Sequence, residues 1–185
     1  MRYETFDPEV HDVSEVATFV YDVDFRTFDM LFKSPDRAIG TIAKSLEDED
    51  LETFMVILDD DANLIGLLIY YIDEFPSHFN FKSLRLLIVD ILDYFVLSDV
   101  GQGDLYVAEI AIDKSLRGQG LGKEVLLDVI DYARNENLDR VILDADFRNH
   151  GAKRLYERLG FKVHNKKRVK FLNFERGMYN MEFKL

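Results

Sequence analysis

A glycine-rich turn is the part of this sequence whose residue types and spacing best suit chemistry. The run Arg117-Gly118-Gln119-Gly120-Leu121-Gly122-Lys123 follows an apolar stretch with strand character and opens a stretch with helical periodicity. Glycines allow backbone angles that other residues avoid, and they let a ligand approach the main chain closely. The free N–H groups at a helix start bind anions such as a pyrophosphate. Arg117 and Lys123 add positive charge, so we expect this turn to hold an anionic group.

Two other phosphate-binding loops fit the turn less well. A Walker loop requires a glycine, four residues and then Gly-Lys-Ser/Thr, but Arg117 stands five residues before Gly122 and Glu124 follows Lys123. A Rossmann fingerprint requires a third glycine where Lys123 stands. A glycine-rich turn alone also fits a tight strand–helix connection, so the surrounding sequence has to decide.

Two expected strands carry carboxylates that could act as bases. Glu109 lies in the middle of the apolar stretch 105–112, where a carboxylate is costly unless it is paired or used. Asp144 and Asp146 alternate with apolar residues in the stretch 140–147, so both point to one face of a strand. Each position could instead hold a salt bridge or lie at a sheet edge.

The elements that would position these residues alternate strands with helices, which favours an α/β fold. We expect strands at 2–6, 54–58, 64–71, 105–113 and 140–147, and closing strands at 161–163, 169–174 and 179–183 with Gly177 in the last turn. A polar loop at 59–63 predicts a hairpin. Helices are expected from Asp7-Pro8-Glu9 onward, at 37–47, at 121–133 and at 152–159, the last ended by Gly160.

The segment 79–97 carries a broad apolar stripe at helical spacing and predicts a further helix. Arg85, Asp90 and Asp93 interrupt it, so it cannot span a bilayer. Core packing explains the stripe, and a surface for a partner helix or a homodimer is a second interpretation.

Composition limits the classes of function. A chain of 185 residues has the length of one domain, and the absence of cysteine excludes a disulfide framework, a thiolate nucleophile and a Cys-based zinc site. The four histidines are scattered, so we expect no metal site. A net charge of −12 repels phosphate backbones and anionic lipids, so neither nucleic acid nor membrane is an expected partner. The N-terminus lacks the apolar stretch of a signal peptide, and a cytoplasmic location is expected.

Three segments together resemble the GNAT acetyltransferase superfamily. They are Ile110-Ala111-Ile112-Asp113, the turn 117–122, and Asn149 followed by Ala152, Leu155-Tyr156-Glu157 and Gly160-Phe161. The resemblance covers about 105–161, the expected cofactor-binding core. It implies a single domain over 1–185 with a mixed sheet of about seven strands, the fourth and fifth splayed apart, and helices on both faces. The helix expected at 79–97 would then be an insertion.

The resemblance implies that the chain uses acetyl-CoA as cosubstrate. The pantetheine arm would lie between the splayed strands, and the N–H near Ile110 would polarise the thioester carbonyl. The turn would hold the pyrophosphate, and Asn149 would reach the pantetheine. The implied cofactor-binding residues are Ile110, Ala111, Ile112, Arg117, Gly118, Gln119, Gly120, Leu121, Gly122, Lys123 and Asn149.

The resemblance also implies direct acetyl transfer to a primary amine. Tyr156 stands where the family commonly keeps a tyrosine near the sulfur, so its phenol could protonate the leaving thiolate or position it. An alkyl amine with a pKa near 10 is only about 0.1% neutral at pH 7, so a base is needed. Glu109 is the first candidate. Asp144 is the second, since some relatives that modify protein N-termini carry a glutamate there.

The acceptor is either a cationic small amine or polyamine, which an acidic protein attracts, or an amine of a protein or peptide. A non-catalytic CoA-sensing or protein-interaction module on the same fold is the alternative function.

Overall fold

Strands and helices alternate along much of the chain in the computed structural model, which describes all residues except 24, 48–52, 74–94 and 172–173. The described residues fall into two compact units. The first unit contains Met1–Tyr70 and Glu109–Gly122, and the second contains 71–73, 95–108 and Lys123–Leu185. The helix expected at 79–97 lies almost entirely in 74–94, outside the described residues.

The first unit contains an antiparallel ladder. Strand β1 (Arg2–Thr5) pairs with β2 (Phe54–Leu58), which pairs with β3 (Leu64–Ile72). The carboxylate of Asp59 closes the β2–β3 hairpin by accepting hydrogen bonds from the main chain of Asp61 and Asn63. This confirms the hairpin that the polar loop predicted.

The first unit also contains helices α1 (Val13–Val23), α2 (Phe25–Leu31) and α3 (Pro35–Leu46). Helix α3 agrees with the prediction, with Ser34 as its N-cap. The start predicted at Asp7-Pro8-Glu9 is wrong, because residues 8–10 form a turn before the helix. The carboxylate of Asp12 instead accepts hydrogen bonds from the N–H groups of Ser14 and Glu15, so this residue caps α1.

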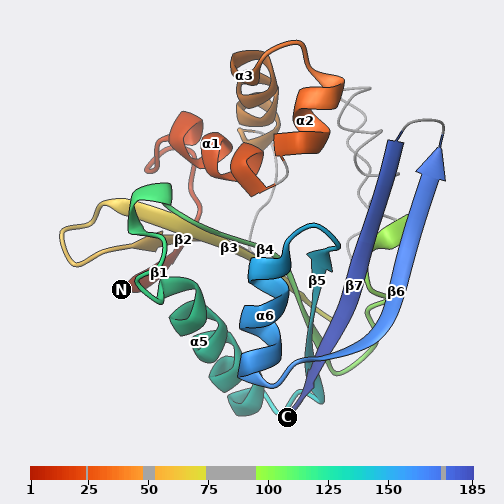
Figure 1. Cartoon of the computed structure of the whole chain (residues 1–185). Coiled ribbons are helices and arrows are strands. Elements are labelled where there is room, and N and C mark those ends of the chain that lie inside the picture. The colour runs from red at the N-terminus through yellow and green to blue at the C-terminus, as the bar shows by residue number, and fades with distance from the viewer. Residues whose placement is uncertain (24, 48–52, 74–94, 172–173) are drawn as a thin grey trace. The chain divides into compact units, whose positions relative to one another are not determined.

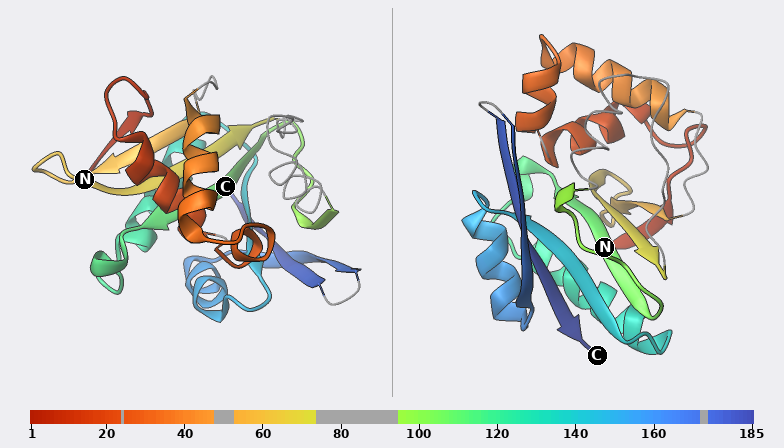
Figure 2. Two further views of the ribbon diagram at one scale, coloured as in Figure 1. Left: turned by 90° about the horizontal axis from the view of Figure 1, so that it is seen from above. Right: turned by 90° about the vertical axis from the view of Figure 1, so that its right-hand side faces the viewer.

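The second unit is built around β5 (Arg140–Asp146), whose core residues Val141, Ile142 and Leu143 are almost fully buried. The first part of β4 (Asp104–Ile112) runs parallel to β5, and β7 (Phe174–Lys184) runs antiparallel to it. β6 (Lys162–Phe171) pairs with β7. Figure 2 shows β5 and β7 side by side. The guanidinium of Arg140 binds Asp104 at 2.6 Å and Glu182 at 2.8 Å, joining the three strands at one end.

The predicted closing strands were wrong in number and bounds. Two long strands replace the three short ones, and Gly177 lies inside β7, opposite Arg168, rather than in a turn. A Cβ at Gly177 would lie 2.4 Å from ring carbons of Phe147. The glycine therefore makes room for an aromatic side chain inside the strand instead of breaking it.

Two further helices follow along the chain, α5 (Leu121–Asn135) and α6 (His150–Leu159). The left-handed Gly160 ends α6, as predicted. The strand order is β1-β2-β3-β4-β5-β7-β6, a mixed seven-stranded sheet to which β4 contributes residues from both units (Figure 1). The α/β fold expected from the sequence is therefore confirmed.

Candidate acetyl-CoA site

The glycine-rich turn has the backbone geometry that an anion site needs. A single 3-10 turn, Lys114–Leu116, precedes it, and α5 begins at Leu121. Gly118 and Gly120 have φ angles of 83° and 91°, in the left-handed region that favours glycine. No heavy atom lies within 4 Å of a Cβ built at either position, so the turn is open to an approaching group. The first N–H groups of α5 have no partner within the helix.

The charged residues at the turn are also suited to binding an anion. Arg117 and Lys123 are exposed. Before the turn, the carboxylate of Asp113 accepts hydrogen bonds from the backbone and hydroxyl of Ser115, which hold the pKa of Asp113 below its ordinary value. Lys114 binds Asp22 of α1 at 2.7 Å. The ion pair of Lys114 connects the start of the turn to α1, and Arg117 and Lys123 remain accessible to an anion.

The last residues of β4 include four that sequence reasoning placed at the site. Ala111 is buried, and Glu109, Ile110 and Ile112 are half-buried. A Cβ at Gly66 of β3 would lie 2.3 Å from the carbonyl oxygen of Ala111, so this glycine lets β3 and β4 approach closely.

The parallel ladder between β4 and β5 has four residue pairs, from Asp104 with Arg140 to Val107 with Leu143. Both strands continue beyond the ladder, to Ile112 and Asp146. If β4 and β5 splay apart as expected, their pairing has to end before the strands themselves do, as this ladder does.

Asp144 follows this ladder on β5 and accepts four hydrogen bonds. The backbone N–H of Ser98 and the hydroxyl of Tyr106 donate to Oδ2, both at 2.9 Å. The hydroxyl of Ser98 and the amide of Asn180 donate to Oδ1. A carboxylate has about four lone-pair positions, so these donors fill it. A carboxylate in this state fixes the positions of the groups that donate to it.

The same network fixes the segment 96–99. Asn180 Nδ2 also donates to the carbonyl of Val96 at 3.0 Å, and Lys167 donates to the carbonyl of Leu97 and the carboxylate of Asp99, both at 2.8 Å. Sequence reasoning missed Ser98, Tyr106 and Asn180. Their positions in the chain carry no local signal, because Tyr106 and Asn180 reach Asp144 only when β4, β5 and β7 pair, and Ser98 reaches it from the segment before β4.

Tyr156 lies on α6 and is half-buried. Burial raises the pKa of its phenol to about 12, and the negative charge of Asp144 contributes in the same direction. The hydroxyl therefore keeps its proton throughout the physiological range. Asn149 caps α6, its side-chain oxygen accepting from the N–H of Ala152 at 3.1 Å. Its amide nitrogen is the group it can offer to a ligand.

The expected site residues divide between the two units. Glu109, Ile110, Ala111, Ile112 and the turn up to Gly122 belong to the first unit. Lys123, Asp144, Asn149 and Tyr156 belong to the second, in which the charge of Asp144 acts on Tyr156.

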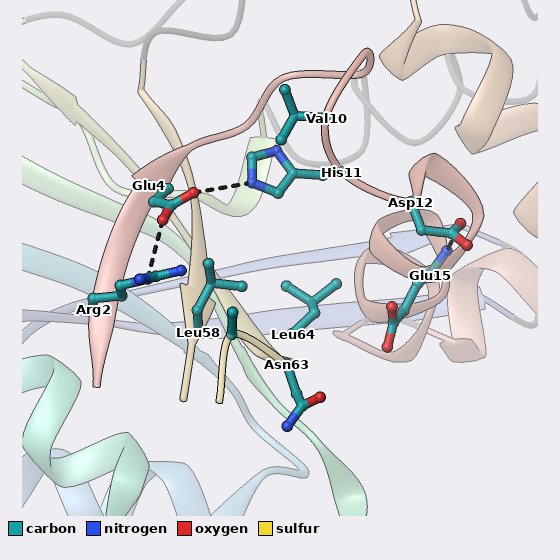
Figure 3. Close-up of a pocket in the computed structure, with 10 residues that line it drawn as sticks. Arg2, Glu4, Val10, His11, Asp12, Glu15, Leu58, Asn63 and Leu64 are labelled. Carbon is teal, nitrogen blue, oxygen red and sulfur yellow. Dashed lines mark hydrogen bonds and ion pairs between the residues drawn. The ribbon is translucent and has the colours of Figure 1, made fainter. Parts of the chain in front are cut away.

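A separate cavity in the first unit contains none of the expected site residues (Figure 3). Its volume is about 450 Å³, and polar side chains of β1, α1 and the segment between them face it. His11 Nδ1 accepts from the N–H of Asp7, and His11 Nε2 lies 3.5 Å from Glu4, which also binds Arg2. Burial and the nearby charges of Asp12 and Asp113 raise the pKa of Glu15.

The described part of the chain contains neither a metal-binding cluster nor a helix that could span a membrane. Among the described residues, no group of three or more His, Cys, Asp or Glu side chains could hold a metal ion. None of the described helices is long and apolar enough to cross a membrane.

Comparison with known proteins identifies the class that this fold and turn define. The model of the acetyltransferase (GNAT) family matches residues 17–161, most of the chain. The protein belongs to the GNAT family of acetyltransferases, and the resemblance noted in the sequence is confirmed.

Individual relatives match over shorter stretches. Glucosamine 6-phosphate N-acetyltransferase of Trypanosoma brucei brucei is 33% identical over 61 residues, which are 33% of this chain and 40% of that protein. N-alpha-acetyltransferase 30 of Schizosaccharomyces pombe is 36% identical over 56 residues, 30% of this chain and 37% of that protein. The matches thus span about two fifths of the length of these curated relatives.

Solved structures match over the whole fold. An N-acetyltransferase from Staphylococcus aureus Mu50 superposes with a TM-score of 0.68 at 19% identity, covering 99% of this chain and 100% of that one. A chain of the NatC complex bound to Gag peptide and CoA superposes with a TM-score of 0.57 at 18% identity, covering 100% and 98%. At this level of identity, these likenesses establish the fold alone.

Proposed function

We propose that this protein transfers an acetyl group from acetyl-CoA to a primary amine by direct attack within a ternary complex. The observation that carries the proposal is the open turn before α5, with Gly118 and Gly120 in the left-handed region, in a chain that belongs to the GNAT family. GNAT enzymes use acetyl-CoA, which supplies an activated thioester for the reaction.

The residues at the turn fit the anionic part of acetyl-CoA. Main-chain N–H groups from Gly118 to Lys123, with the positive end of the α5 dipole, would hold the pyrophosphate. Arg117 and Lys123 would add charge at its edge. The main chain of residues 110–112 would bind the pantetheine amides as a neighbouring strand does, and Asn149 would donate its amide to the same arm.

In the transfer step, the amine nitrogen forms a bond to the thioester carbonyl carbon, and the carbon–sulfur bond then breaks. The N–H near Ile110 would stabilise the oxyanion that forms between these events. The proton lost by the amine goes to a base, and CoA leaves as a thiolate that gains a proton. The chain has no cysteine, which fits direct transfer without a thiol intermediate.

We assign the base role to Glu109 rather than to Asp144. Each oxygen of Asp144 already accepts two hydrogen bonds, so at least one donor would have to be displaced for that carboxylate to accept a proton. Glu109 is half-buried near the end of β4, next to the residues proposed to bind pantetheine. A partly desolvated carboxylate there could take the amine proton directly or through a water molecule.

We assign Tyr156 the role of a hydrogen-bond donor to the sulfur. Its pKa of about 12 lies well above the ordinary thiol value of about 8.5, so complete proton transfer to the thiolate would be uphill. A phenol that always retains its proton can still stabilise the charge that develops on sulfur.

The acceptor is proposed to be a small cationic amine or polyamine, or the amine of a peptide. Two relatives are named for acetylation of glucosamine 6-phosphate and of α-amino groups, and both substrates are amines. The acidic surface favours a cationic acceptor through long-range attraction.

The decisive experiment measures CoA release with acetyl-CoA and a panel of monoamines, polyamines, amino sugars and peptides with free N-termini. We expect saturable release with at least one acceptor and acetyl-CoA binding at sub-millimolar concentration. Binding without transfer to any acceptor would support the non-catalytic CoA-sensing module. Absence of acetyl-CoA binding would refute both functions.

A further inference from the structure

The positive charge of this acidic chain is concentrated in one segment. Residues 148–170 contain nine of the 23 lysines and arginines and only one of the 35 aspartates and glutamates. The segment therefore carries a net charge of +8, and the rest of the chain carries −20. It forms α6 and most of β6, both within the second unit.

Three basic residues of β6 share one face of the strand, and Lys167 lies on the other face, where it binds Asp99. Lys166, Arg168 and Lys170 are exposed and alternate along it; we call these three residues the basic edge. They pair in register with Tyr179, Gly177 and Glu175 of β7, which also alternate, so all six share one face of the hairpin. Glu175 binds Arg168 and is the one carboxylate among them. The basic edge keeps a positive surplus after this ion pair is counted.

Tyr179 links the basic edge to α6. The Lys166 ammonium lies 5.4 Å from the centre of its ring, and the Lys153 ammonium of α6 lies 5.1 Å from it. The ring of Phe147 packs against Tyr179 at 4.6 Å. Glu157 of α6 already pairs with Lys153, so an anionic group placed beside this ring would be attracted mainly by Lys166.

β6 also offers a sheet edge. It stands last in the strand order, and among the described residues β7 is its only strand neighbour (Figure 1). Such a strand has main-chain N–H and C=O groups on its outer side that can pair with another extended segment. The edge is ten residues long.

We propose that the basic edge docks an acidic peptide segment, which adds to β6 as a further strand with its carboxylates facing Lys166, Arg168 and Lys170. Main-chain hydrogen bonds provide affinity, and the alternating cations select a peptide with acidic residues at every second position. This surface is a partner site in addition to the acetyl-transfer function and does not depend on it.

Two other occupants fit less well. A symmetric pair of β6 edges from two copies would bring the same cations together. For a nucleic acid, the Tyr179 ring is a poor stacking platform, because Lys153, Lys166 and Phe147 already contact it.

The test uses a ten-residue fluorescent peptide of alternating Glu and Val, N-acetylated so that it cannot be an acetyl acceptor. Its affinity for the full chain is measured by anisotropy at low and high salt. We expect binding that weakens with salt, and a loss of about 10-fold or more in the variant K166E/R168E/K170E. The matched control K33E/R37E/K44E changes three exposed cations of the first unit by the same total charge and should bind nearly as the parent does.

Two further probes separate the alternatives. A peptide of alternating Glu and Pro has the same charge but cannot pair as a strand, and we expect it to bind at least about 5-fold more weakly. Equal binding of this peptide, or an equal loss in the control variant, would overturn the proposal. Tighter binding of a ten-nucleotide uridine RNA would overturn it in favour of a nucleic-acid surface. Unchanged far-UV circular dichroism and melting temperature establish that both variants fold.

Discussion

At the scale of single residues, Asp144 influences its surroundings through hydrogen bonds and through its charge. Asp144 is held by donors from Ser98, Tyr106 and Asn180, and its charge helps to keep the proton on Tyr156. Sequence reasoning recognised both residues but assigned Asp144 a chemical role. The hydrogen bonds favour a positioning role for Asp144, so the proposed function assigns the chemical steps to Glu109 and Tyr156.

Replacing Tyr156 by Phe removes the proposed donor while keeping the ring. We expect kcat to fall about 10- to 100-fold, because the charge on the leaving sulfur loses its hydrogen bond. The Kd for acetyl-CoA should change by less than about 3-fold. Steady-state kinetics and calorimetric titration measure the two quantities. The control is Tyr132→Phe, at an exposed position of α5. An undiminished kcat in Tyr156→Phe would remove the assigned role.

Replacing Asp144 by Asn should destabilise the protein, because donors in the network would lose a charged acceptor. We expect the free energy of unfolding to fall by about 2–3 kcal/mol. The pKa of Tyr156 should also move back toward its ordinary value, since a negative charge is lost. Urea unfolding and ultraviolet titration of the tyrosines test these effects. Asp99→Asn, at a side chain that is 91% exposed, should change stability by less than about 1 kcal/mol, and similar losses in both variants would contradict the network.

At the scale of elements, the sequence predicted those parts whose signal is local. The turn before α5, the β2–β3 hairpin and the glycine end of α6 all rest on a few consecutive residues with special backbone geometry. The end of the chain was predicted poorly because Gly177 resembles a turn residue. The glycine is required by a contact with Phe147, which lies in the turn after β5, and this contact depends on tertiary packing.

The contact between Gly177 and Phe147 predicts coupling between two positions. Gly177→Ala should lower the free energy of unfolding by about 1–3 kcal/mol, because a Cβ would lie 2.4 Å from the ring. In the background of Phe147→Ala, the same change should cost much less. A double-mutant cycle in urea measures this difference. Additive effects would mean that the ring does not require the glycine.

At the scale of the whole molecule, the net charge alone gives an incomplete description of the surface. The value of −12 is the sum of +8 on one segment and −20 on the remainder. The sum predicts a general attraction for cations, but it conceals the basic edge. The prediction of one domain over 1–185 stays a prediction. The division of expected site residues between two units could not be anticipated from local patterns, which do not report relative placement.

Stability toward acid should depend on Glu182. The hydrogen bond from Arg140 holds the pKa of Glu182 below its ordinary value of 4.5. A lowered carboxyl pKa contributes stability that is complete above the unfolded value and is lost as pH falls through the folded value. We therefore expect the free energy of unfolding to decline from about pH 5 downward, and less steeply in Glu182→Gln. Urea midpoints across this range measure the slopes. Glu136→Gln at an exposed position should follow the parent, and parallel curves for all three proteins would refute the assignment.

The order β5-β7-β6 has a consequence for synthesis. β7 follows β6 in the sequence but lies between β6 and β5 in the sheet. As the ribosome extends the chain from its N-terminus, β5 and β6 emerge without the strand that joins them. The second unit can therefore complete its sheet only when residues 174–184 have left the exit tunnel, so its assembly waits for its final strand.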